Sequence, residues 1–239
     1  MAVRFLPSGD SGLTIEFGLH IDRNLSRQIM ALRAAVDDAK LVGVIETVPT
    51  YRSLLVHYDP TLIRQAELVA MIEPMIAHLG EQDGHGARLW RLPICFEADF
   101  ATDLGHVAEF GQMDVAELRT ILTGTDHFVY MLGFAPGMPY MGDLPSQLNI
   151  PRRKAPALDI AKGSVLVATG LTIIYPAVNP SGWHVVGRCP VPMFDLSRDE
   201  PALLSPGDIV RFRDVGLSEF SEIADRIEEG SYPLEGENI

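Results

Sequence analysis

The sequence has 239 residues, 47% of them hydrophobic, which is enough apolar material for one large domain or two domains of ordinary size. The formal net charge of −13 argues against nucleic acid or an anionic membrane as a partner, because binding phosphate groups requires a basic face. Composition and acidity together favour a soluble globular protein.

The chain opens with two short strand patterns followed by a helical pattern. Residues 3–6 and 13–17 predict strands separated by a turn that contains glycines. Residues 22–36 predict a helix whose first turn Asp22 can cap. Its apolar residues at helical spacing are Leu25, Ile29, Leu32 and Val36.

A second helix is expected after residues 44–48 and 54–58, which are rich in β-branched and aromatic residues and predict two more strands. Asp59-Pro60 predicts the cap and first position of this helix, and Gly80 its end. Its apolar stripe would be Leu62, Ala66, Val69, Ile72 and Ile76. The order ββαββα predicts a small α+β domain over residues 1–80, with a mostly antiparallel sheet covered on one face by two helices.

A polar segment with two glycines, residues 81–86, predicts a linker to a second domain that spans residues 81–239. A strand is expected at residues 89–96 and a helix around residues 104–110. Another helix begins after Asp114, which is followed three positions later by a glutamate, as in a capping box.

Residues 128–132 predict a buried strand that runs into a rigid loop. The loop is rich in glycine and proline, at Gly133, Pro136, Gly137, Pro139 and Gly142. Proline fixes φ and glycine permits angles closed to other residues, so this alternation specifies one backbone path. The large apolar side chains expected near a surface of this loop are Phe134, Met138, Tyr140 and Met141. They either close one end of a β structure or bind a ligand.

After residue 150 the chain shows only short apolar runs between glycines and prolines. The runs predict strands at residues 164–169, 172–175, 183–187 and 209–212. Many short strands with frequent turn signals are typical of a closed or sandwiched β structure. Residues 217–227 predict a terminal helix, and the acidic tail at residues 228–239 is expected to be mobile.

Signatures of known catalytic and metal sites are missing from the sequence. Cys95 and Cys189 are far apart and lack metal-ligand spacing, which predicts two buried thiols, no disulfide and no metal site. The sequence has no nucleophile elbow, phosphate loop or zinc-protease helix, which argues against a self-contained hydrolase or NTPase. Histidines such as His127 and His184 are more often structural than acid–base groups. Residues 1–9 lack a signal-peptide pattern and no apolar stretch reaches membrane-spanning length, so we expect a cytoplasmic protein.

A cluster of positive charge, residues 152–154, stands out in this acidic chain, in which lysine occurs only at positions 40, 154 and 162. Such a cluster can hold a carboxylate or phosphate, since arginine donates two parallel hydrogen bonds. The alternative is an exposed turn whose charges pair with nearby carboxylates. Arg188 is a comparable candidate. The aromatic residues that could wall such a pocket are Tyr140, Tyr175 and Trp183.

Residues 133–142 resemble the GFxPGFPYLG motif of the family of 5-oxoprolinase B subunits, also called KipI-like or allophanate hydrolase subunit 1. Further matches are Arg4-Phe5-Leu6-Pro7, Tyr51-Arg52-Ser53-Leu54, Pro151-Arg152-Arg153, Ile174-Tyr175-Pro176, Pro180-Ser181-Gly182-Trp183 and Gly187-Arg188-Cys189-Pro190. The resemblance covers nearly the whole chain. It implies a mainly β, cyclophilin-like barrel domain over residues 81–239, with inserted and terminal helices, and it implies that the basic run lies beside the barrel groove.

We therefore expect a substrate pocket in the second domain. Its binding residues would be Arg152, Arg153, Arg188, Tyr140, Tyr175, Trp183 and His184, and its loop Gly133, Phe134, Pro136, Gly137, Met138 and Pro139. The sequence departs from the family pattern at the rim, with Ala157 in place of an arginine, Ile160–Lys162 in place of Val-Pro-Ala and Leu171–Ile173 in place of Gln-Thr-Gly. Loss of a charged partner at a buried site costs about 2 to 5 kcal/mol, which predicts a changed ligand preference.

The resemblance implies a non-autonomous subunit of an ATP-dependent 5-oxoprolinase complex. Such a complex converts 5-oxo-L-proline, ATP and water to L-glutamate with the help of an A subunit and a homologous C subunit. ATP is expected to belong to the complex, because no ATP site is evident in this chain. One alternative is a KipI-type inhibitor of histidine kinase autophosphorylation. A second alternative is a diverged member of a related allophanate or urea amide hydrolase or carboxylase system.

Overall fold

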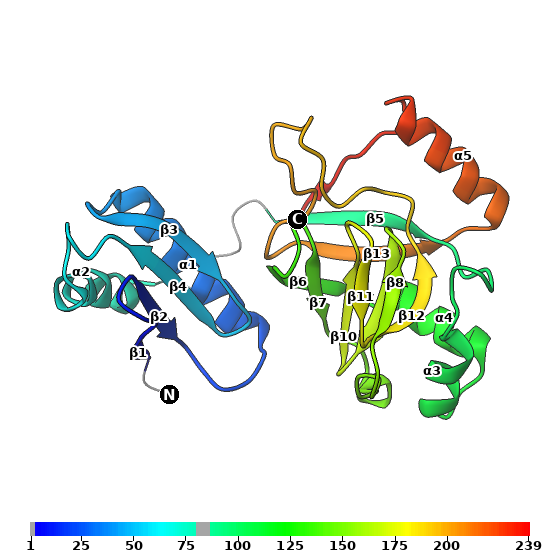
Figure 1. Cartoon of the computed structure of the whole chain (residues 1–239), viewed down its shortest axis with the longest axis horizontal. Coiled ribbons are helices and arrows are strands. Elements are labelled where there is room, and N and C mark those ends of the chain that lie inside the picture. Colours follow the sequence, from blue (N-terminus) through cyan, green and yellow to red (C-terminus); the bar gives the residue numbers. More distant parts are fainter. Residues whose placement is uncertain (1–2, 80–86) are drawn as a thin grey trace. The chain divides into compact units, whose positions relative to one another are not determined.

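The structure, a computed structural model, describes residues 3–79 and 87–239 of the chain. The chain divides into two compact units, residues 1–86 and 87–239 (Figure 1). The predicted domain boundary at residue 80, the helix end at Gly80 and the predicted linker at residues 81–86 lie outside the described residues. Each unit combines sheet and helix, so the prediction of a mixed chain of α and β structure is confirmed.

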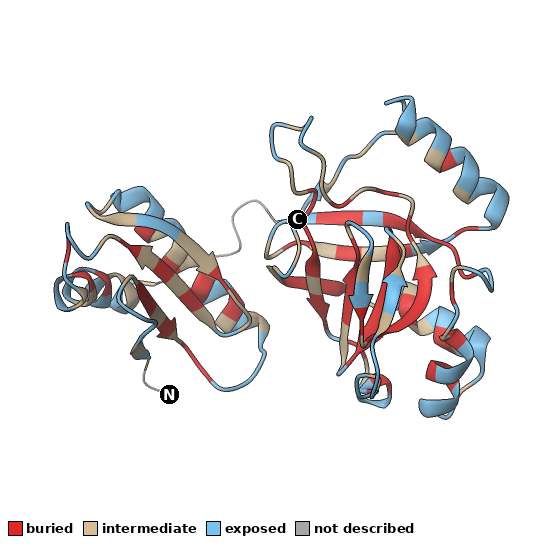
Figure 2. Cartoon of the chain, in the orientation of Figure 1, coloured by how far each residue is buried: buried red, intermediate tan, exposed pale blue. Residues whose placement is uncertain are grey.

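The first unit is built on a four-stranded antiparallel sheet with the strand order β1-β2-β4-β3. Its strands are β1 (Arg4–Pro7), β2 (Gly12–Glu16), β3 (Val44–Pro49) and β4 (Ser53–Tyr58), and its helices are α1 (Arg23–Ala39) and α2 (Gln65–Ala77). Alternate residues of the strands and one stripe of each helix meet in a single core, in which Leu13, Leu32 and Leu54 are fully buried (Figure 2).

The two helices of this unit begin in different ways. The Asp22 carboxylate accepts hydrogen bonds from the backbone N–H groups of Asn24 and Leu25, so the predicted cap of α1 is confirmed. The predicted start of α2 at Asp59-Pro60 is wrong, because α2 begins at Gln65. The Asp59 carboxylate instead accepts hydrogen bonds from the backbone N–H and the hydroxyl of Thr61, at 2.8 and 2.7 Å. Such local bonds stabilise a turn in competition with a helix.

The second unit holds an eight-stranded sheet with the order β12-β9-β10-β7-β6-β13-β5-β14, in which only the β13–β5 pair is parallel. The strands are β5 (Arg88–Ile94), β6 (His127–Leu132), β7 (Pro139–Gly142), β9 (Ser164–Ala168), β10 (Leu171–Ile174), β12 (His184–Arg188), β13 (Ile209–Asp214) and β14 (Glu237–Asn238). The helices are α3 (Leu104–Phe110), α4 (Val115–Gly124), the short 3₁₀ helix η1 (Ser146–Leu148) and α5 (Leu217–Glu228). The strands β8 (Ala157–Ile160) and β11 (Asn179–Ser181) form a separate two-stranded ribbon.

The eight-stranded sheet is not a closed barrel. In the described residues its strand order ends at β12 on one side and at β14 on the other, so the predicted cyclophilin-like barrel is not confirmed. The segment after β5 nevertheless reaches β12: the backbone N–H and C=O groups of Cys95 and Arg188 bond at 2.8 and 3.0 Å. The sheet therefore curls so strongly that β12, at one edge, meets the segment that follows β5, the strand next to the other edge.

Four short strands of this unit differ from the prediction. Residues 139–142, predicted as loop, form β7, which pairs with both β6 and β10. The strands β8 and β11 were not predicted, since proline and charged residues interrupt their apolar pattern. The tail was predicted to be mobile, but β14 pairs with β5 and the Ile239 N–H bonds to the Ala87 carbonyl at 3.1 Å.

Candidate functional site

A second apolar cluster lies in the second unit, apart from its main core. We call it the Trp183 cluster. Its buried members are Met138, Leu166, Ala168, Ile173, Tyr175, Trp183 and Val185, and Ala135, Tyr140, Ile160 and Leu171 pack against it. Strand alternation explains the separation, because Val185 faces this cluster whereas Val186 faces the main core. The cluster brings together the predicted loop and the three predicted aromatic residues.

The three aromatic residues of the Trp183 cluster also carry polar atoms. Tyr140 meets the Trp183 ring edge-on, with the ring centroids 6.1 Å apart. Trp183 and Tyr175 are buried, and the Tyr175 hydroxyl donates a hydrogen bond to the Pro180 carbonyl at 3.1 Å. Tyr140 is half-buried, and burial raises the pKa of its hydroxyl while the nearby charge of Arg152 opposes the rise.

The glycine- and proline-rich segment forms the turn of a β6–β7 hairpin rather than a long loop. The Gly133 N–H bonds to the Met138 carbonyl at 3.1 Å, which closes the turn. Phe134 has a backbone φ of 66°, which residues other than glycine rarely adopt, and its side chain is 71% exposed. Of the four large apolar side chains predicted near a surface, only Phe134 is exposed, because Met138 and Met141 are buried and Tyr140 is half-buried.

Gly137 is the position in this turn that requires glycine. Its φ is +72°, and a Cβ atom placed there would lie 2.7 Å from the Met193 carbonyl oxygen and 2.9 Å from the Phe194 Cβ. Both the conformation and the close backbone contact exclude a larger residue. Pro136 is exposed beside it, and Pro139 opens β7, where the first position of a strand tolerates proline.

Arg152 lies at the rim of the Trp183 cluster. Its guanidinium carbon is 5.4 Å from the centroid of the Trp183 ring, and the residue is exposed. In the described part of the chain it forms no ion pair. Arg152, Tyr140 and Trp183 together offer a positive group beside two aromatic rings, an arrangement that suits a small ligand with one negative charge and one apolar face.

Arg153 points to a different partner. Its guanidinium pairs with the Asp103 carboxylate, which also accepts a hydrogen bond from the Val185 N–H at 2.7 Å. The Asp103 N–H in turn bonds to the Val185 carbonyl at 2.9 Å, so Asp103 ties the start of α3 to β12. The Nε atom of Arg153 is buried and has no hydrogen-bond partner in the described residues. No sequence pattern singles out Asp103, which looks only like a residue before a helix.

His184 and Arg188 stand at the two ends of β12. His184 is buried, and its Nε2 lies 3.0 Å from the Pro151 carbonyl, which fixes Nε2 as the donor. Its ring also contacts the ring of His106, at 5.3 Å between centroids. Arg188 lies over the Phe100 ring at 4.4 Å, and burial lowers the pKa of its guanidinium. The structure therefore places Arg152 at the Trp183 cluster, and Arg153, His184 and Arg188 along β12.

The positions at which the sequence departs from the family pattern belong to the same region. Ile173 is a buried member of the Trp183 cluster, and Leu171 packs against the cluster. Thr172, which lies between them in the sequence, is also buried. Ala157 and Ile160 lie on β8, whose Ile160 side chain also packs on the cluster. Ala157 and Leu171 stand where the family motif has polar side chains, and Leu171 extends the apolar surface of the cluster.

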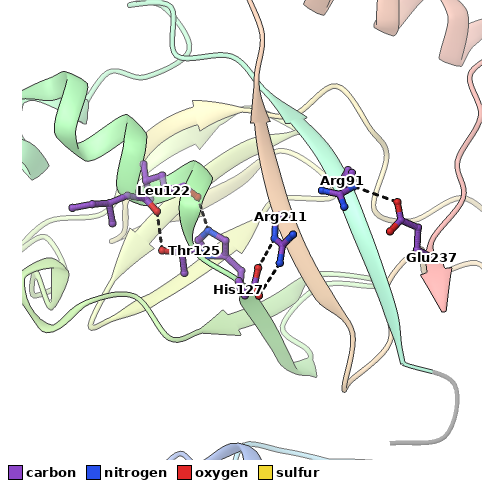
Figure 3. Close-up of polar contacts among 8 residues, drawn as sticks. Arg91, Leu122, Thr125, His127, Arg211 and Glu237 are labelled. Atoms are coloured by element: carbon purple, nitrogen blue, oxygen red, sulfur yellow. Dashed lines mark hydrogen bonds and ion pairs between the residues drawn. The ribbon is translucent and has the colours of Figure 1, made fainter. Parts of the chain in front are cut away.

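His127 and its neighbours form a separate polar network near β13 (Figure 3). The Nε2 of His127 bonds to the Leu122 carbonyl at 2.8 Å, and burial lowers the pKa of His127 from 6.5 to about 4. Arg211 donates two hydrogen bonds to the Asp126 carboxylate, at 2.6 and 3.0 Å. These contacts join α4, β6 and β13 and support the prediction of a structural histidine.

Groups that could act in catalysis were sought in the candidate site among the described residues. In the described residues no hydrogen bond joins a serine, threonine or cysteine of this region to a histidine. Burial raises the pKa of the Cys189 thiol to about 12, so this cysteine stays protonated and unreactive. No group of three or more potential metal ligands occurs in residues 3–79 and 87–239.

The structure contains no membrane-spanning helix over the residues it describes.

The sequence of the chain matches a known class of domain. Residues 3–204 match the family described as carboxyltransferase domain, subdomain C and D. The chain belongs to this family.

Within this class, the 5-oxoprolinase B subunit of Bacillus subtilis (strain 168) is 32% identical to the chain, over 85% of the chain and 89% of that protein. The predicted membership in the family of 5-oxoprolinase B subunits is thereby confirmed. The crystal structure of TTHA0988 matches with a TM-score of 0.76 at 28% identity, over 90% of the chain and 40% of that protein, so the chain spans about two-fifths of it. The urea amidolyase of K. lactis shares the fold, with a TM-score of 0.82 at 22% identity over 99% of the chain and 16% of that protein.

Proposed function

We propose that the chain is a non-autonomous subunit of an ATP-dependent 5-oxoprolinase complex, in which 5-oxo-L-proline, ATP and water give L-glutamate. The observation that carries the proposal is the 32% identity to a 5-oxoprolinase B subunit over 89% of that protein. The candidate site offers aromatic rings and a guanidinium, which suit the binding of a small anionic ring. The partners of the chain are homologues of the 5-oxoprolinase A and C subunits.

In this proposal the chain contributes the substrate contact at the Trp183 cluster. 5-Oxoproline is a small ring with a carboxylate, and Arg152 beside Tyr140 and Trp183 matches both features. Tyr140 is half-buried, so a 5-oxoproline ring beside it would be partly shielded from water. A charge-assisted hydrogen bond is stronger in such surroundings than in water. Tyr140 and Arg152 orient the substrate, and groups on the partner subunits act on the amide bond.

The three arginines predicted for the candidate site do not converge on one ligand position. A triphosphate requires several convergent donors. Here Arg152 lies over Trp183, Arg153 is paired with Asp103, and Arg188 lies over Phe100. The three guanidinium groups have three different partners, so we assign the nucleotide to another member of the complex.

The test is reconstitution from purified parts. The chain is mixed with the homologues of the A and C subunits from the same source, and glutamate and ADP are measured with 5-oxoproline and ATP as substrates. Glutamate formed with one ADP per turnover supports the proposal. ADP formation without glutamate, at saturating 5-oxoproline, contradicts it.

A urea-related system is the second candidate, because the fold of the K. lactis urea amidolyase matches over 99% of the chain. The replacement at Leu171 raises the same possibility, since it puts an apolar side chain where the family motif has a glutamine. The reconstituted complex is therefore also given urea and allophanate. Ammonia release from either of them, with no glutamate from 5-oxoproline, moves the assignment to this second candidate.

A further inference from the structure

A short segment without regular secondary structure carries Arg152 past β12. The residue before it, Pro151, accepts a hydrogen bond at its carbonyl from the Nε2 of the buried His184 ring, at 3.0 Å. The residue after it, Arg153, donates its backbone N–H to the Gly182 carbonyl at 2.7 Å. The backbone on both sides of Arg152 is therefore tied to β12 or to the chain that leads directly into it.

The side chain of Arg153 ties the same segment to a third place, the start of α3. Its guanidinium pairs with the Asp103 carboxylate, which also accepts the hydrogen bond of the Val185 N–H at 2.7 Å. Only 14% of the Asp103 side chain and 30% of the Arg153 side chain are exposed. A charge-assisted contact that is shielded from water and shares its carboxylate with a backbone donor is held in one geometry more strongly than an exposed ion pair.

Asp103 makes these contacts instead of capping α3. It occupies the position before the helix, where the side chain of an aspartate ordinarily accepts hydrogen bonds from the first N–H groups of the helix. The Asp103 side chain makes no such bond, whereas Asp22 and Asp114 cap α1 and α4 in this way. Its carboxylate is directed at β12 and Arg153, so its contacts serve the segment around Arg152 rather than the helix.

We propose that Asp103 and His184 are positioning residues, which hold the segment around Arg152 so that its guanidinium stays over the Trp183 ring. Arg152 is exposed, and an exposed arginine side chain has many rotamers. Fixing its backbone before the substrate arrives lowers the entropy lost on binding. The inference rests on the proposed function for the role of Arg152 as a substrate contact, and on the hydrogen bonds and the ion pair for how Arg152 is held.

The first measurement is made on the full chain alone, by NMR of the arginine Nε–H groups. The ring current of Trp183 displaces the Nε–H resonance of Arg152, which is identified by its loss in Arg152→Lys. We expect Asp103→Asn and His184→Phe to move this resonance most of the way to its position in the unfolded chain, while the other resonances stay dispersed as in the folded chain. The matched control, Asp214→Asn, breaks another ion pair of the same unit and should leave the resonance in place.

The second measurement is the KM for 5-oxoproline of the reconstituted complex, at saturating partner subunits. We expect Asp103→Asn to raise it about tenfold with kcat within about twofold, because a displaced cation weakens substrate binding and leaves the reacting bond untouched. When Arg152 is already alanine, Asp103→Asn should add less than about twofold, since its effect passes through that side chain. His184→Gln keeps an N–H donor for the Pro151 carbonyl and should stay within about twofold of the parent.

Two results overturn the inference. One is an Arg152 resonance that stays in place in both variants, and the other is a rise in KM for Asp103→Asn that is as large without the Arg152 side chain as with it. Arg153→Ala breaks the same ion pair and keeps the Val185 hydrogen bond, so it replaces Asp103→Asn if that variant does not fold. If the parent complex forms no glutamate, the proposed function fails, while the NMR comparison still decides how Arg152 is held.

Discussion

Gly137 occupies a left-handed backbone position, and its missing side chain lets the hairpin turn lie directly against Met193 and Phe194. We expect Gly137→Ala to lower the free energy of unfolding by about 2 kcal/mol or more, because strain at positive φ adds to a contact that must open. The measurement is urea denaturation. The matched control is Gly230→Ala, with a φ of +71° and nothing within 4 Å of the added methyl group, where about 1 kcal/mol is expected. Equal losses for the two variants would show that the close approach costs nothing.

His127 makes the stability of the protein depend on pH. In the folded chain its pKa is about 4, below the 6.5 of an exposed histidine, because burial disfavours the charged form. The unfolded chain therefore binds more protons between these pH values, so stability falls as the pH is lowered through this window. The full shift corresponds to about 3 kcal/mol.

The test compares the free energy of unfolding at pH 7 and pH 4.5 for the parent and for His127→Gln. We expect the parent to lose about 2 kcal/mol more than the variant over this interval, since glutamine does not titrate. His20→Gln, at an exposed histidine, should behave like the parent. An identical pH dependence for parent and His127→Gln would mean that the buried ring takes up its proton without unfolding.

Arg152 carries the predicted substrate contact. In the reconstituted complex, at saturating partner subunits, Arg152→Ala should raise the KM for 5-oxoproline by one to two powers of ten, since a charge-assisted hydrogen bond is worth about 1.5 to 3 kcal/mol. Arg152→Lys should recover part of this, because an ammonium supplies charge without the planar fork. The control is Arg226→Ala, which removes a guanidinium held 5.4 Å from the centroid of the Tyr232 ring. If the KM values of all three variants lie within about twofold of the parent's, Arg152 does not bind the substrate.

Among the elements of the second unit, the loop before β13 is held to β5 by one buried carboxylate. Asp208 accepts hydrogen bonds from the Trp90 indole N–H and from the backbone N–H groups of Arg88 and Ser205, all at 2.9 Å. Burial raises the pKa of Asp208, and these hydrogen bonds oppose the rise. The carboxylate joins two segments that are distant in sequence, β5 and the loop before β13.

We expect Asp208→Ala to lower the free energy of unfolding by about 3 kcal/mol, because three donors lose their acceptor and the Trp90 N–H is buried. Asp208→Asn keeps one acceptor oxygen and should lose about half as much. The measurement is guanidinium denaturation followed by tryptophan fluorescence and by circular dichroism, with Asp199→Ala as an exposed control. A loss below about 1 kcal/mol for Asp208→Ala would show that water replaces the carboxylate.

Elements whose signals are local were predictable from the sequence. Asp22 and Asp114 cap α1 and α4 as expected, because a cap depends on neighbours two or three residues away. Asp59-Pro60 carries the same local pattern but forms a turn, since a hydroxyl at Thr61 offers the carboxylate a closer partner. The strand β14 has two residues with no apolar alternation, and only its pairing with β5 defines it.

The candidate site was predictable only in part. The aromatic residues Tyr140, Tyr175 and Trp183 were named from the family motif, and they meet in one cluster. The adjacent arginines 152 and 153 were grouped by sequence, but they have different partners, because the chain places one beside Trp183 and the other beside Asp103. A pairing between residues 50 positions apart depends on how the sheet curls, and no local pattern encodes it.

At the scale of the whole molecule, the chain combines an acidic overall charge with a positive segment at residues 144–190. The strand β8 belongs to this segment, and its Ile160 packs inward on the Trp183 cluster while Leu158 is exposed. Under the proposed function, this chain contributes a substrate contact to a reaction that is carried out by an assembly.

The proposed function requires that 5-oxoproline is cleaved only when this chain is present, which an omission experiment can establish. Glutamate formation from 5-oxoproline and ATP is measured for the homologues of the A and C subunits without this chain, for this chain alone, and for the three together. We expect glutamate from the complete mixture only, with a rate at least about 100-fold above either partial mixture. Equal rates with and without this chain, or no glutamate from the complete mixture, would contradict it.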